Sequence, residues 1–207
     1  MNNGLDDPMN LIEAQQLKLS RGGVPLWHDL SFSVGPGLTF VRGGEGRGKS
    51  SLLQVMAGTM EPDSGTVRRL ARTTFHESPA DPVHDAGVAS DWLAARQASL
   101  PGWDAGVATG LIEGFGLAEH IHKPMYMLST GSRRKVGLVA AAASGAELTL
   151  IDTPFAALDT PSCRVLTQLL REAAQGDRRA WVMADYELPA SLAGARLAGL
   201  IDLGDWP

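Results

Sequence analysis

The chain has 207 residues, of which 44% are hydrophobic and 20% are charged, a composition that is typical of globular proteins and excludes disordered and fibrous chains. Its formal net charge of -5 lacks the basic footprint of nucleic-acid-binding proteins, so we expect no nucleic-acid partner.

The first part of the chain is rich in β-forming residues. Apolar runs at residues 11–19 and 25–34 are separated by an Arg-Gly-Gly turn at 21–23, a pattern that predicts a β-hairpin. A Gly-Pro-Gly turn at 35–37 then leads into a short apolar strand at 38–41.

A glycine-rich loop follows this strand and matches the phosphate-loop pattern G-x-x-x-x-G-K-[ST] at every position. The segment 50–57 after it favours a helix that ends at Gly58. Closely spaced glycines let backbone N–H groups and the positive helix terminus surround an anion. The sequence therefore predicts a nucleotide-phosphate site formed by Gly43, Gly44, Glu45, Gly46, Arg47, Gly48, Lys49, Ser50 and Ser51.

Two side chains of this loop carry the chemistry. Lys49 can reach the β- and γ-phosphates of a nucleotide, and we expect it to act in catalysis as well as binding. Ser50 can offer its hydroxyl to Mg²⁺. The alternative, an incidental glycine-rich turn, does not explain the strand before the loop or the helix after it.

The spacing of apolar residues changes after the loop helix. Short strands are expected at 66–69 and 73–75. Between about residues 78 and 124 the spacing becomes helical, notably at 89–98 and 105–115, which indicates an inserted helical lobe.

The last third predicts a strand-helix-strand unit. Strands at 148–151 and 181–184 flank a helix at 161–174, so these strands should be parallel. We expect a final helix and strand within 192–203, and one domain over residues 1–207.

Asp152 follows the strand at 148–151. In a phosphate-loop protein such a carboxylate holds Mg²⁺ through water, and we assign Asp152 to this role. A strand-end aspartate can also simply cap a turn, so the assignment depends on its neighbours.

One such neighbour is the segment 128–132, Leu-Ser-Thr-Gly-Ser, which precedes an alanine-rich helix. With it the chain resembles the ABC ATPase family, whose signature Leu-Ser-Gly-Gly-Gln opens a helix before the acidic strand. The resemblance spans about residues 11–203. It implies an α/β fold, a P-loop NTPase cassette with a parallel core sheet, an N-terminal antiparallel β-subdomain and an inserted helical subdomain.

The resemblance implies an ATP clamp between two subunits, as a homodimer or a heterodimer. Ser129 and the amide of Gly131 would meet the γ-phosphate of an ATP molecule held by the opposite subunit, although Ser129 could also be a plain helix cap. Thr130 and Ser132 replace a Gly and the Gln of the usual motif. The implied cofactors are ATP and Mg²⁺.

Three further positions are assigned through the resemblance. Residues 157–159, Ala-Leu-Asp, correspond to the family's D-loop, which makes subunit contacts. Glu77 is the nearest equivalent of the family's glutamine that touches Mg²⁺ and senses a transmembrane permease. The permease would bind beside this loop and the helical lobe. Arg21 occupies the region of an adenine-stacking aromatic, where a solvated turn arginine is the alternative.

Two positions depart from the family pattern. Thr153 stands where active members have a glutamate that polarises the attacking water, and Asp185 stands where a histidine contacts the γ-phosphate. Threonine is no base at neutral pH, and a carboxylate repels phosphate. We therefore expect intact ATP binding and slow or partner-dependent hydrolysis, with Asp185 or Glu77 as replacements that could orient water.

The resemblance implies the ATP-binding subunit of a membrane transporter. In its compact length and in the His-containing segment 75–79, Phe-His-Glu-Ser-Pro, the chain is similar to the haem-export cassettes of cytochrome c maturation. The alternatives are an ATP-gated regulatory module without transport and a small-molecule kinase, which would leave the segment 128–132 without a role.

The sequence also bears on location. The first eight residues lack the basic and apolar regions of a signal peptide, and the apolar stretch 136–151 is too short and mixed to span a bilayer. The single Cys163 is compatible with a reducing compartment. We expect a cytoplasmic protein that reaches the inner face of the cell membrane through its partner.

Overall fold

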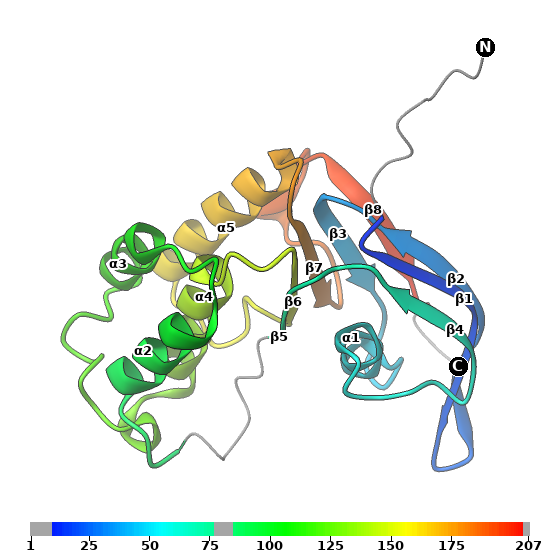
Figure 1. Cartoon of the computed structure of the whole chain (residues 1–207), viewed down its shortest axis with the longest axis horizontal. Coiled ribbons are helices and arrows are strands. Elements are labelled where there is room, and N and C mark those ends of the chain that lie inside the picture. The colour runs from blue at the N-terminus through cyan, green and yellow to red at the C-terminus, as the bar shows by residue number, and fades with distance from the viewer. Residues whose placement is uncertain (1–9, 77–84, 205–207) are drawn as a thin grey trace.

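The chain, described by a computed structural model over residues 10–76 and 85–204, forms two β-sheets and a group of helices (Figure 1). The antiparallel sheet has the order β2-β1-β4 and consists of β1 (Ile12–Arg21), β2 (Val24–Val34) and β4 (Ser64–Arg69). The parallel sheet has the order β5-β6-β7-β3-β8 and consists of β3 (Gly37–Arg42), β5 (Thr74–His76), β6 (Leu148–Asp152), β7 (Ala180–Asp185) and β8 (Leu197–Asp202).

The helices are the second component. They are α1 (Lys49–Ala57), α2 (Ala89–Ser99), α3 (Ala105–Gly114), α4 (Thr130–Ala143) and α5 (Thr160–Gln175), with short 3-10 turns η2 (Met125–Met127) and η3 (Ala190–Leu192). None of the helices in the described ranges is long and apolar enough to cross a membrane.

The predicted secondary structure is largely confirmed. The hairpin, the loop helix that ends at Gly58, the two helices of segment 89–115 and the parallel strand-helix-strand unit are all present. The prediction of a helix within 192–203 is wrong, because only the 3-10 turn η3 precedes β8. Gly194, with φ +79°, and the following residues lead directly into the strand, which leaves no room for a full helix.

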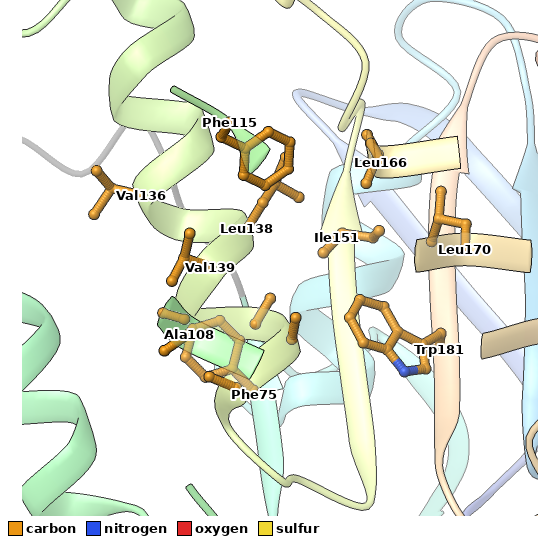
Figure 2. Packing of buried hydrophobic residues seen from close by; sticks show 14 of the residues in the cluster. Phe75, Ala108, Phe115, Val136, Leu138, Val139, Ile151, Leu166, Leu170 and Trp181 are labelled. Carbon is orange, nitrogen blue, oxygen red and sulfur yellow. The ribbon is translucent and has the colours of Figure 1, made fainter. Parts of the chain in front are cut away.

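The parallel sheet separates two hydrophobic cores. Strand β6 shows this arrangement, since Leu148 and Leu150 belong to the core on the side of α1 and the antiparallel sheet, whereas Ile151 belongs to the core beneath α4 and α5. Figure 2 shows Ile151 and Trp181 of the sheet beside side chains from these helices. Because both faces are covered, the strand is buried at four of its five positions.

The order of the strands positions the functional residues. Strands β6, β7 and β3 are adjacent and parallel, so their carboxyl ends meet at one edge of the sheet. The phosphate loop follows β3, Asp152 ends β6, and Asp185 ends β7 between them. Ligands of open α/β sheets bind at this edge.

Candidate nucleotide-binding site

The phosphate loop has the backbone that its glycines predict. Gly46 and Gly48 have φ values of +74° and +82°, in the left-handed region that favours glycine. A Cβ atom at Gly48 would also lie 2.7 Å from Nε1 of the buried Trp27 and 3.0 Å from Cδ1 of Leu26. The loop is thus packed closely on strand β2, and α1 begins at the next residue, Lys49.

The Lys49 side chain curls back over its own loop. Its ammonium group donates hydrogen bonds to the carbonyl oxygens of Gly43, at 2.7 Å, and Gly44, at 2.9 Å. These bonds hold the cation over the mouth of the loop, where it can exchange carbonyl oxygens for the more basic oxygens of a phosphate.

The other predicted loop residues have different surroundings. Glu45 is exposed, and Arg47 donates through Nε to the carbonyl oxygen of Leu203, at 2.9 Å. The side chain of Arg47 therefore fastens the loop to the chain after β8. Ser51 is 3% exposed within α1, so its side chain packs in the protein interior.

Ser50 and Asp152 have the donor chemistry of a Mg²⁺ site. The Ser50 hydroxyl donates a short hydrogen bond to Oδ2 of Asp152. The other carboxylate oxygen, Oδ1, is buried and lacks a hydrogen-bond partner within the described residues. A buried carboxylate oxygen is costly unless a cation or water satisfies it. Because Mg²⁺ is commonly held by one carboxylate, a hydroxyl, water and substrate phosphates, these residues fit it.

Glu77, the third predicted metal ligand, lies outside the described residues. In residues 10–76 and 85–204 there is no group of three His, Cys, Asp or Glu side chains that could enclose a metal ion. Within these ranges Ser50 and Asp152 are the predicted metal ligands that the structure brings together.

Asp185 lies between the phosphate loop and Asp152. Its backbone pairs with Arg42, the last residue of β3, and its Oδ1 accepts the Tyr186 N–H at 2.7 Å. Burial raises the pKa of the Asp185 carboxyl, and the Asp152 charge raises it further. The Tyr186 hydrogen bond and the charges of Lys49 and Arg134 partly offset this rise. A carboxylate in this position faces both the cation and the metal-site residue.

His76 is a second titratable group at this edge, and sequence reasoning did not assign it. It ends β5, which pairs with β6 in parallel. Burial lowers the pKa of His76, and the nearby Asp152 charge partly offsets this. The sequence signal that could have identified it is its position as a titratable residue directly after the predicted strand at 73–75.

The signature segment lies at the start of α4. Ser129 is the N-cap, and its hydroxyl oxygen accepts the N–H of Ser132 at 3.1 Å. Gly131 packs against the segment 157–159, because a Cβ atom at this position would overlap the carbonyl oxygen of Ala157. In the part of the chain that the structure describes, no hydrogen bond joins Ser129 or Gly131 to the phosphate loop of the same chain. The cap role of Ser129 is compatible with anion binding by the exposed helix terminus.

The segment after the signature is joined to the D-loop region by an ion pair. Lys135 donates to Oδ2 of Asp159 at 2.7 Å, and Oδ1 of Asp159 accepts the Ser162 N–H at 2.8 Å. Both hydrogen bonds, that of Lys135 most strongly, lower the pKa of the Asp159 carboxyl. Arg21, for which adenine stacking and a solvated turn arginine are the two alternatives, is exposed at the end of β1.

Arg134 is the other residue that sequence reasoning missed. It is 9% exposed, and its Nη1 donates to the carbonyl oxygens of Asp152 and Thr153. In the sequence it is one of three consecutive basic residues after the signature, and nothing there distinguishes it from its two neighbours.

Comparisons with known proteins identify the family of the chain. The ABC transporter family matches residues 27–156. The cytochrome c biogenesis ATP-binding export protein CcmA of Rhizobium meliloti (strain 1021) is 33% identical over 196 residues, which cover 88% of this chain and 94% of that protein. CcmA of Cupriavidus pinatubonensis (strain JMP 134 / LMG 1197) is 32% identical over 203 residues, covering 91% and 89% of the two chains.

Solved structures support the fold. The ATP-binding subunit of an ABC transporter superposes with a TM-score of 0.77 at 19% identity, covering 94% of this chain and 87% of that chain. A nucleotide-free ATP-binding cassette superposes with a TM-score of 0.71 at 16% identity, covering 95% and 89%. The predicted cassette fold, with its parallel and antiparallel sheets, is therefore confirmed. The chain belongs to the ABC transporter family, as one of its ATP-binding cassettes.

Proposed function

We propose that this chain is the ATP-binding subunit of a membrane exporter and acts by closing with a second cassette around ATP. The observation that carries the proposal is the presence of two half-sites on one chain. One is the loop with Lys49, beside the Ser50 and Asp152 pair, and the other is the capped start of α4 with Ser129. Such half-sites complement each other between two copies and not within one.

Each residue has a physical task in this proposal. The loop amides and Lys49 bind the β- and γ-phosphates, and Ser129 with the Gly131 amide binds the γ-phosphate presented by the other subunit. Ser50 and Asp152 would hold Mg²⁺, which when bound neutralises phosphate charge. The whole chain acts as one domain, with residues 78–124 and the Glu77 loop as the surface for a transmembrane partner.

The proposal favours transport over the regulatory alternative because both CcmA relatives are named as export proteins. The gene neighbourhood is the first test, because an adjacent membrane-protein gene would identify a candidate permease. Co-expression of the chain with such a protein is the second. We expect the chain to fractionate with membranes only when that protein is present. A chain that stays in the soluble fraction in both cases and still forms an ATP-dependent dimer would favour the regulatory module.

Hydrolysis is proposed to be slow. Thr153 has no basic group, and general-base assistance is commonly worth ~10² to 10⁴ in rate. Asp185 or Glu77 would orient the water in place of the missing glutamate, and an intact second cassette would provide one productive site in a heterodimer. Turnover by the purified chain should therefore be low, and Thr153→Glu should raise it. Brisk wild-type turnover that Asp185→Ala abolishes and Thr153→Glu does not increase would contradict this.

ATP affinity provides the central test. Lys49→Ala removes the cation over the loop, and we expect the dissociation constant for ATP to rise by about 10²-fold, as for loss of a charge-assisted contact worth roughly 3 kcal/mol. Lys18→Ala, which removes an exposed lysine from the antiparallel sheet, is the matched control and should leave affinity unchanged. Equal ATP affinity in wild type and Lys49→Ala would overturn the nucleotide assignment.

A further inference from the structure

Thr153 and Ala157, which follow Asp152 in the chain, have unusual backbone φ angles. Thr153 has φ +42° and Ala157 has φ +61°, both in the left-handed region. For a β-branched residue such as threonine this conformation is a genuine outlier, and it persists only where the surroundings enforce it. The chain turns here directly from the end of β6, so the orientation of Asp152 depends on the same turn.

Arg134 supplies that enforcement from helix α4. One guanidinium nitrogen, Nη1, donates to the carbonyl oxygen of Asp152 at 3.0 Å and to that of Thr153 at 2.8 Å. The residue is 9% exposed, and its Nε has no hydrogen-bond partner within the described residues. A charged donor that bridges two consecutive carbonyl groups fixes their two peptide planes relative to each other, and with them the backbone angles of Thr153.

The buried charge of Arg134 also lies near the carboxylates of this edge. Its positive charge acts on Asp185, as that of Lys49 does. On the opposite side of the turn, the Thr153 N–H donates to the Ala184 carbonyl oxygen at 2.8 Å. The peptide after Asp152 is therefore held on one side by β7 and on the other by Arg134.

We propose that Arg134 is a positioning residue for the metal-binding carboxylate. By holding the Asp152–Thr153 turn in its left-handed conformation, it keeps the Asp152 side chain against Ser50, with Oδ1 free for a cation. Arg134 touches neither nucleotide nor metal in this role and acts through Asp152. The inference rests on the proposed function, because it requires that Ser50 and Asp152 hold Mg²⁺.

The first measurement compares ATP affinity of the full chain with excess Mg²⁺ and with EDTA. We expect Arg134→Met to weaken binding in Mg²⁺ by about 10- to 100-fold, the range for groups that orient metal ligands, and to change binding in EDTA by less than about threefold. Arg134→Lys keeps a cationic donor and should recover part of the loss. Arg133→Met, one position away on α4 and paired with Asp85 instead, should behave as wild type in both conditions.

The second measurement asks whether Arg134 acts through the backbone of Thr153. Glycine adopts φ +42° without strain, so Thr153→Gly should restore most of the Mg²⁺-dependent affinity to Arg134→Met. Lack of restoration in a folded double variant overturns the positioning role. Equal losses in Mg²⁺ and EDTA also overturn it, since they indicate general damage. If Arg134→Met does not fold, ATP affinity is compared between Arg134→Lys and wild type. A loss for Arg134→Lys that is larger in Mg²⁺ than in EDTA supports the positioning role, and an equal loss or no loss in the two conditions overturns it.

Failure of the inference is distinct from failure of the proposed function. If wild-type affinity is the same in Mg²⁺ and EDTA, the Ser50 and Asp152 site itself is wrong. If wild type depends on Mg²⁺ and Arg134→Met retains that dependence in full, only the role of Arg134 is wrong.

Discussion

The phosphate loop and the turn at residues 153–157 both take left-handed backbone conformations, but they are stabilised differently. The loop places glycine at these positions, Gly46 and Gly48, so its shape follows from local sequence. The turn places Thr153 and Ala157 there, and neither residue favours the conformation. Its shape therefore depends on contacts from elsewhere in the fold.

Those contacts come from helix α4. Arg134 binds the first carbonyl groups of the turn, Gly131 packs on the carbonyl of Ala157, and Lys135 binds Asp159. The helix that begins with the signature thus supports the strand-end carboxylate Asp152. A change in α4 should therefore affect the turn that carries Asp152 and leave the phosphate loop in place. The following predictions compare changes in the two regions.

The largest effect is expected for Gly131→Ala. The added methyl group would overlap a backbone carbonyl that cannot rotate away, and overpacking of this kind costs about 1–3 kcal/mol, with this contact at the upper end. Denaturant unfolding measures it. Gly110→Ala in α3, where the methyl group meets open space, is the control and should stabilise by about 0.5–1 kcal/mol. Equal effects of the two substitutions would show that Gly131 is not required for packing.

Gly48→Ala should destabilise the loop somewhat less, by about 1–2 kcal/mol for the left-handed backbone, with an added penalty from the contact with Trp27. Gly46→Ala carries the backbone penalty alone, because no atom lies within 4 Å of the added methyl group. The difference in unfolding free energy between the variants isolates the packing of the loop on β2. A larger loss for Gly46→Ala would contradict this account.

Lys135→Met should lower the melting temperature at neutral pH, since it removes the Asp159 partner. Because the pKa of Asp159 is lowered in the folded state, the stability it confers is present above the unfolded pKa of about 4 and is lost as the pH falls below it. The difference in melting temperature between wild type and variant should therefore become smaller in acid. The variant should keep some acid dependence, because Asp159 still accepts the Ser162 hydrogen bond.

The control for this prediction is Arg68→Met, which breaks the ion pair between Arg68 and Glu13. The Arg68 side chain is 65% exposed, so its loss should shift the melting temperature little. If the difference in melting temperature between wild type and Lys135→Met is the same at pH 2 as at neutral pH, the lysine stabilises by packing rather than by charge.

The smallest effect is expected for Asp185→Asn. Removing a negative charge near the phosphates should tighten ATP binding by about fivefold, as for roughly 1 kcal/mol between unit charges 4 Å apart in water. The raised pKa of Asp185 means that charging it costs stability as the pH rises, so the variant should also melt higher at pH 7 than wild type, and equally below about pH 4.

Glu187→Gln provides the matched control, because this exposed carboxylate lies just beyond the end of β7. It should leave ATP affinity unchanged. If both substitutions tighten binding equally, the effect reflects net charge and not the position of Asp185.

Much of the fold was predictable because its signals are local. The hairpin, the loop helix and the strand at 148–151 each follow from periodicity and turn residues. The wrong helix within 192–203 shows the limit of such signals. That segment adds the edge strand β8 to β3, and pairing with β3 determines its conformation more than its own preferences do.

The sequence by itself determined the phosphate-binding loop, since glycine spacing and a lysine at a helix start suffice to build an anion site. It also identified the carboxylate Asp152 as the end of a strand. Only the tertiary structure decided which side chains support these groups. Arg134 reaches the backbone of Asp152 from α4, and His76 lies at the end of β5, where the Asp152 charge acts on its pKa. Because helix packing and strand order bring these elements to Asp152, no local pattern in the sequence shows that they surround it.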